Sequence, residues 1–166
     1  MADYEKHAKT PEISDYSNFD AFIPKNTSSY TKSHVTDNHF YNPATKEHYI
    51  IELKAGGDLD NKKAKSEKIE LLKEYFILKN ELVGTDETVR IFFATAYNKN
   101  GEDNEWKQER VRQFFAEDEL LIGKNYWNFV CDDEDGFNII YDQYKISCQY
   151  ILESLEKIKS MYCLWD

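Results

Sequence analysis

The sequence predicts an α/β domain built on a mixed β-sheet with flanking helices. Three observations predict it: a two-strand pattern around residue 45, a helical pattern from about 64 to 83, and a buried strand pattern from 88 to 97. A strand, a helix of this length and a second strand form a right-handed crossover, which makes the two strands parallel. The hairpin adds an antiparallel strand, so the sheet is expected to be mixed.

Composition is consistent with such a domain. The chain has 166 residues, with 41% hydrophobic and 15% aromatic residues, enough for a globular core. No apolar run approaches the length of a membrane span, and the N-terminus lacks the apolar core of a signal peptide. The three cysteines, Cys131, Cys148 and Cys163, lack CxxC spacing, which favours reduced thiols and a cytoplasmic location.

The first 33 residues read as a polar N-terminal segment, with a short strand near Phe19–Ile23. We expect residues 34–166 to form the domain. Its first two strands are predicted at His34–Tyr41 and Glu47–Lys54, joined by the turn-rich stretch Asn42–Lys46. The thin N-terminal segment raises the expectation of a missing N-terminal part or of a second subunit.

The helix predicted at 64–83 carries an apolar stripe, with Asn61 or Ser66 as its cap and Gly84 as its end. Thr88–Tyr97 is β-branched and aromatic, as in a strand buried on both faces, and Tyr97 is counted among the packing aromatics. A further helix is expected at 105–119. The last helix is predicted at 137–161, with Ile140, Tyr144, Cys148, Ile151, Leu155 and Ile158 at three- and four-residue steps. That helix either covers the sheet or forms a dimer face.

Charged residues at the end of the second strand are the best candidates for chemistry. Glu52 and Lys54 point to the same side of a strand, just before Gly56 and Gly57, which permit close approach of a ligand. Asp37 lies on the opposite arm of the hairpin, where it can approach Glu52. Carboxylates that hold a hard cation, beside a lysine, suit metal-assisted phosphodiester cleavage. The alternatives are that Asp37 only adds polarity to a turn and that Glu52 and Lys54 form a surface ion pair.

The net charge of −10 argues against a general nucleic-acid binder. The charge is uneven: residues 1–80 carry 12 Lys and Arg against 13 Asp and Glu, whereas residues 81–166 carry 9 against 18. Local basic groups remain possible in the first half. Lys62, Lys63 and Lys65 are candidates for phosphate contacts or for a solvated helix start.

The segment 106–113 is the richest in side chains that read base edges. Lys107, Arg110 and Gln113 are its candidate DNA contacts, preceded in a loop by Asn98, Lys99 and Asn104. A plain amphipathic helix has a similar pattern.

Asp37 with Glu52-Leu53-Lys54 resembles the D…(D/E)xK arrangement of restriction-endonuclease-like nucleases. The longer strings IIELKAGGDLDNKKAKSEKIELLKEY (50–75) and FFATAYNKNGEDNEWKQERVRQFFAEDELLIGKNYWNFV (92–130) are similar to the TdeIII family of type II restriction endonucleases. The resemblance implies a restriction-endonuclease-like fold and a Mg²⁺-dependent enzyme that cuts double-stranded DNA at a short, GC-rich, near-palindromic site. It also implies a homodimer and 5′-phosphate ends.

By the same resemblance, Asp37, Glu52 and the backbone oxygen of Leu53 hold the metal, and Lys54 is the catalytic lysine. Two other readings remain open. One is a nuclease-fold fragment or subunit that binds DNA or a partner without cutting, and the other is a structural interaction protein.

Overall fold

A computed structural model describes residues 14–16, 35–56 and 58–162 of the chain. The chain divides into two compact units, Met1–Gly123 and Lys124–Asp166. Most of the expected polar N-terminal segment, including the strand proposed near Phe19–Ile23, lies outside the described residues.

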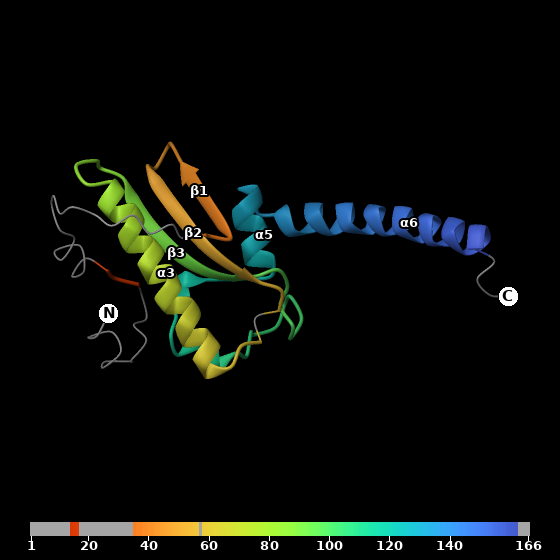
Figure 1. The fold of residues 1–166 in the computed structure, drawn as a ribbon, viewed down its shortest axis with the longest axis horizontal. Coiled ribbons are helices and arrows are strands. Elements are labelled where there is room, and N and C mark those ends of the chain that lie inside the picture. The colour runs from red at the N-terminus through yellow and green to blue at the C-terminus, as the bar shows by residue number, and fades with distance from the viewer. Residues whose placement is uncertain (1–13, 17–34, 57, 163–166) are drawn as a thin grey trace. The chain divides into compact units, whose positions relative to one another are not determined.

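The first unit contains a four-stranded mixed sheet, as predicted (Figure 1). Its strands are β1 (Asn38–Asn42), β2 (Glu47–Lys54), β3 (Thr88–Thr95) and β4 (Leu120–Ile122), in the order β1-β2-β3-β4. β1 and β2 form the expected antiparallel hairpin, although β1 begins four residues later than predicted. β3 is parallel to β2, which confirms the crossover, and β4 is parallel to β3.

The crossover helix is α3 (Asn61–Glu81), which covers one face of the sheet (Figure 1). It begins three residues before the predicted start because Asp60, rather than Asn61 or Ser66, caps it. The Asp60 carboxylate accepts a hydrogen bond from the Lys63 N–H at 2.8 Å. The helix ends before Gly84. Its φ of 94° is a left-handed backbone conformation that residues with a Cβ rarely adopt, and it lets the chain turn after the helix.

The core forms between α3 and the sheet. Ile50, Ile91 and Phe93 contribute from β2 and β3, and Leu71 and Leu72 contribute from α3. Side chains two residues apart on a strand share a face, so Glu52 and Lys54 lie on the same side of β2 as Ile50. The packing of α3 therefore sets the surroundings of both charged residues.

The prediction of a helix at 105–119 is wrong. The structure has only one helical turn, α4 (Glu109–Arg112), and a 3₁₀ turn, η1 (Glu117–Glu119), directly before β4. Trp106 and Gln108 are both buried, a two-residue spacing that a helix does not place on one face. The Asn100 side chain also holds the Lys107 N–H at 3.0 Å in a non-helical conformation. Strand β4 was not predicted because three residues give almost no periodic signal.

A buried ion pair joins α3 to η1. Lys68 Nζ lies 2.5 Å from the Glu119 carboxylate, and each side chain is only 2% exposed. Burial lowers the pKa of Lys68, and the Glu119 carboxylate opposes that shift. Tyr16 contacts both groups, and Ser14 donates from its N–H and hydroxyl to Asp118 at 2.8 Å. The described N-terminal residues are thus fixed to the turn before β4.

The second unit consists of α5 (Lys124–Cys131) and α6 (Gly136–Tyr162), which confirms the long final helix. The two helices meet at a tight turn. The Phe137 N–H donates to the Asn128 side chain at 2.9 Å, and a Cβ on Gly136 would lie 2.7 Å from the Trp127 carbonyl oxygen. Glycine is therefore required for this close approach. None of the helices in the described ranges combines the length and apolar character that crossing a membrane requires.

We expect Lys68→Met to destabilise the first unit by about 3–5 kcal/mol, because Glu119 would keep a buried charge without its partner. The double variant Lys68→Met/Glu119→Gln should recover most of that loss. Urea unfolding followed by circular dichroism measures both. Equal stabilities of the wild type and the single variant would contradict a buried charged pair.

Candidate active site

The three predicted catalytic residues meet at the carboxyl end of β2. Glu52 and Lys54 occupy its last residues on the face toward α3. Asn38 pairs with Ile51 across the hairpin, so Asp37 comes opposite Glu52. The Asp37 carboxylate accepts a hydrogen bond from the Leu53 N–H at 3.1 Å, which holds Asp37 against the strand end. The hairpin register therefore brings the Asp37 carboxylate to the strand end that carries Glu52 and Lys54, near enough for its charge to raise the pKa of Glu52.

Lys54 forms the centre of an acidic cluster. Its amine contacts the Glu52 carboxylate directly and lies 3.2 Å from Glu67 on α3. Burial alone would lower the pKa of Lys54, but the ion pairs with Glu52 and Glu67 outweigh it and the pKa is raised. The lysine is consequently a fixed positive charge among carboxylates.

Glu52 shows the opposite balance. Burial raises its pKa most strongly, the ion pair with Lys54 lowers it, and the negative charges of Glu67 and Asp37 raise it further. The net pKa of Glu52 is raised. A half-buried carboxylate that two other carboxylates repel gains from a nearby cation.

Glu67 was not among the predicted site residues. On sequence alone, Glu67 or Glu70 can lean from the crossover helix toward the metal site, but pairing along the helix is the favoured interpretation. The structure instead directs Glu67 across to Lys54 on β2. Its position could have indicated this contact. Glu67 lies about two turns into the crossover helix, and that helix passes over the end of β2, where Glu52, Leu53 and Lys54 lie.

The donor set suits a hard cation. Asp37 and Glu52 offer carboxylate oxygens, and Leu53, which lies between Glu52 and Lys54, offers a backbone oxygen. Within the described residues no group of three or more His, Cys, Asp and Glu side chains is arranged to hold a metal. Mg²⁺ needs no such group, because it keeps several waters and is commonly bound through one or two carboxylates. The residues thus fit Mg²⁺ better than a metal that requires a complete protein cage.

Tyr97 differs from its predicted role. It is 51% exposed rather than part of the core, and a Cβ on Gly56 would lie 2.7 Å from its hydroxyl oxygen. Tyr97, two residues after the end of β3, therefore lies against Gly56, two residues after the end of β2. Gly57 lies outside the described residues.

The predicted DNA contacts lie near one another at the end of the unit where α3 begins. Lys62 and Lys63 are exposed and Lys65 is half-buried in the first turns of α3, and the first turn contains no acid. Exposed Lys107, Arg110 and Gln113 belong to the α4 segment, and the Gln113 amide donates to the Asn61 side chain at 3.0 Å. This hydrogen bond joins the two groups, which we call the basic rim and define as Lys62, Lys63, Lys65, Lys107, Arg110 and Gln113.

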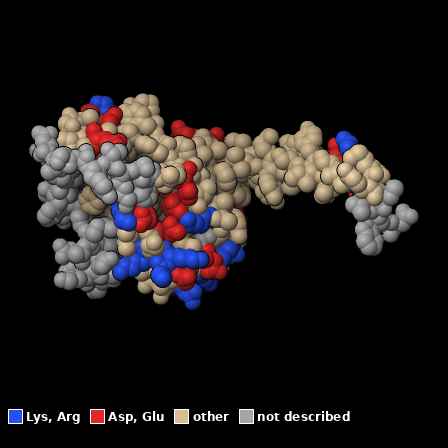
Figure 2. Space-filling view, viewed as in Figure 1, with Lys and Arg blue, Asp and Glu red and all other residues tan. Residues whose placement is uncertain are grey.

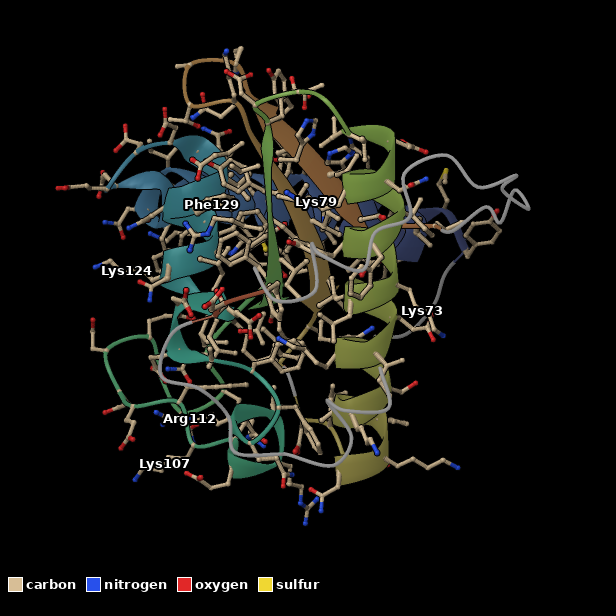
Figure 3. The ribbon with its side chains drawn as sticks, turned by 90° about the vertical axis from the view of Figure 1, so that its left-hand side faces the viewer. Lys73, Lys79, Lys107, Arg112, Lys124 and Phe129 are labelled. Atoms are coloured by element: carbon tan, nitrogen blue, oxygen red, sulfur yellow. The ribbon has the colours of Figure 1, made fainter. Side chains whose placement is uncertain are left out.

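Surface charge shows the same grouping. Figure 2 shows Lys and Arg gathered at this end of the first unit, beside a cluster of acids. In Figure 3, Lys107 and Arg112 lie at the end where α3 begins, whereas Lys79 lies toward the other end of that helix. An acidic protein thus presents a local positive surface near its candidate site.

The loop after β3 is held internally. Asn98 is buried, and its side chain donates to the Asn104 carbonyl at 2.7 Å and accepts from the Asn100 N–H at 3.0 Å. Lys99 pairs with Asp58 at 2.9 Å. Of the three loop residues considered for DNA contact, Asn98 therefore serves to shape the loop.

Comparisons with known proteins were made for the whole sequence. A protein-family model described as "Type II restriction endonuclease, HinfI" matches residues 1–148. Searches of the curated proteins and of the solved structures returned no match. The family match supports the type II restriction endonuclease class, but not the specific TdeIII assignment.

The matched range covers most of the chain, including all four strands of the sheet, α3 and the basic rim. The mixed sheet with its flanking helices agrees with the fold of such enzymes. The chain therefore belongs to the HinfI family of type II restriction endonucleases, and it is a hydrolase that acts on DNA.

Proposed function

We propose that this enzyme hydrolyses both strands of a short, GC-rich and near-palindromic DNA site in a Mg²⁺-dependent reaction that leaves 5′-phosphate ends. The observation that carries the proposal is the convergence of Asp37, Glu52 and Lys54 at the carboxyl end of β2. Asp37, Glu52 and the backbone oxygen of Leu53 would hold the metal. When bound, the ion would lower the pKa of a water and neutralise charge on the phosphate.

Lys54 acts as a fixed cation in this reaction. Its ammonium lies beside Glu52 and is positioned to attract a non-bridging phosphate oxygen or to orient the attacking water. Glu67 is a positioning residue, because it holds the amine from the α3 side at 3.2 Å. When Glu52 binds a cation, Glu67 is a second acid that keeps Lys54 in place.

The basic rim binds the duplex next to this cluster. Lys62, Lys63 and Lys65 contact phosphates near the start of α3, where the helix dipole also favours an anion. Lys107 and Arg110 suit the acceptor atoms of guanine, and Gln113 suits adenine. A divalent cation held by the carboxylates would offset part of the negative charge that DNA meets on this protein of net charge −10.

A near-palindromic site has two-fold symmetry, so we propose that the enzyme acts as a homodimer with one cluster facing each strand. Free Cys131 and Cys148 among the described residues agree with action in the cytoplasm.

Plasmid cleavage tests this function. The purified chain should cut DNA with Mg²⁺, stop cutting when EDTA removes the ion, and bind without cutting in Ca²⁺. We expect Lys54→Ala, Glu52→Gln and Asp37→Asn each to lower the cleavage rate roughly 100- to 1,000-fold, because each removes charge at the reacting phosphate.

The control is Lys73→Ala, which removes a lysine that pairs with Glu70 on α3, the helix that also carries Lys62, Lys63 and Lys65. It should cleave at the wild-type rate. Binding without cleavage in either ion would instead identify a non-cleaving nuclease-fold subunit and overturn the proposed activity.

Replacement of Glu67 tests whether this residue positions the Lys54 amine or only stabilises the fold. Glu67→Gln should lower kcat about 10-fold while KM and DNA affinity in Ca²⁺ stay unchanged, because only the placement of Lys54 is altered. Glu67→Asp keeps the negative charge and should recover part of kcat. A kcat that is unchanged in Glu67→Gln would remove Glu67 from the proposed site.

Charge removal from the basic rim should weaken DNA binding. Lys63→Ala and Lys107→Ala should each lower affinity for any duplex and reduce the slope of log affinity against log salt by about 0.9, as for one lost phosphate contact. Arg110→Ala should also relax the preference at a guanine position. Fluorescence anisotropy across a salt series measures these effects, and an unchanged slope would contradict phosphate contact.

A further inference from the structure

Helix α6 carries a continuous apolar strip that the catalytic proposal does not use. Starting at Phe137, alternating steps of four and three residues reach Tyr162 without meeting a charged side chain. We call these eight positions the α6 seam. Its first half is aromatic, with Phe137, Tyr141 and Tyr144, and its second half is mainly aliphatic, with Ile151, Leu155 and Ile158.

The spacing has a specific geometric meaning. An alternating four-and-three pattern averages 3.5 residues, the repeat that keeps one stripe of a helix facing a second helix as the two wind around each other. The seam spans almost four such repeats, whereas the six charged residues of α6 all lie outside it. Sustained over this length, the pattern is typical of a coiled coil rather than of a helix on a sheet.

The seam is available for such packing. Its aromatic and aliphatic members from Tyr141 onward are largely exposed, apart from half-buried Cys148. Contacts with α5 are concentrated at the start of α6, around Gly136 and Phe137. Ile140, Leu152 and Met161 flank the seam and widen its apolar surface.

The area is sufficient for a stable pairing. Tyr144 is 66% exposed, and an aromatic side chain has about 150–250 Å² to bury, so this residue alone still exposes on the order of 100 Å². Eight seam positions and their flanks together approach the roughly 800 Å² that each partner of a standard interface buries. A helix of this length is about 40 Å long, which accommodates that contact.

We infer that the α6 seam pairs with the same seam of a second copy of this chain, as a two-helix coiled coil. An identical helix has the same repeat and length, so the strip is its own complement across a two-fold axis. The choice of a second copy also rests on the proposed cleavage of both strands, which requires two clusters. The pairing itself needs no DNA.

Two tyrosines on the helix provide a matched test. Tyr144 lies in the seam and Tyr150 lies outside it, yet both are tyrosines on α6 and both are 66% exposed. Light scattering of the full chain without DNA, across a concentration series, should give twice the 19.7 kDa chain mass for the wild type and for Tyr150→Glu. Tyr144→Glu should raise the dimer dissociation constant about 100-fold, because each copy would place a charge in the apolar contact.

Leu155→Glu should repeat that effect in the second half of the seam, with circular dichroism checking that helix content is kept. A monomeric wild type, larger open assemblies, or equal behaviour of Tyr144→Glu and Tyr150→Glu would overturn the inference. Lys54→Ala should remain dimeric, so failure of the catalytic proposal and failure of this pairing are separate results.

Discussion

Parallel pairing of β2 with β3, imposed by the passage of α3 across one face of the sheet, is the constraint on which the candidate active site depends. The register places Lys54 beside Thr95, so the carboxyl ends of β2 and β3 lie next to each other. Packing of Leu71 and Leu72 against Ile50 and Ile91 holds α3 over those strand ends. Because Glu52 and Lys54 share the face of Ile50, the same packing that buries the core brings Glu67 to the lysine. Apolar burial therefore sets the geometry of a charged cluster.

The electrostatic properties of the carboxyl end of β2 depend on the local arrangement of acids and lysines rather than on the net charge of the protein. A protein with ten excess negative charges still gathers exposed Lys62, Lys63, Lys107 and Arg110 near the start of α3 and around α4. Burial raises the pKa of Glu52 most strongly, the ion pair with Lys54 offsets part of that shift, and the charges of Glu67 and Asp37 raise the pKa further. Under the proposed mechanism, the basic rim would attract a DNA phosphate, and a cation held by the carboxylates would neutralise charge on it.

Much of this fold was predictable from the sequence, for local reasons. Glu47–Lys54 and Thr88–Thr95 have strong strand patterns, and a helix between them leaves one handedness of connection. The stretch after Asn98 was not predictable, because its shape depends on side-chain hydrogen bonds from Asn98 and Asn100 and on the joint burial of Trp106 and Gln108. The juxtaposition of Asp37 and Glu52 followed from hairpin pairing. The contact between Glu67 and Lys54 could not be predicted, because it depends on how α3 is rotated about its axis, and local sequence patterns do not determine that rotation.

Residues 14–16 contact residues more than 100 positions later in the chain, through Ser14 with Asp118 and Tyr16 with Glu119. Lys68 also receives its carboxylate partner from Glu119. During synthesis, the hairpin, α3 and β3 can assemble as they emerge from the ribosome, but Lys68 then faces an apolar interior without a counter-charge. The first unit can reach its final stability only after Glu119 has left the exit tunnel, so the last turn before β4 completes a core that the first strands began.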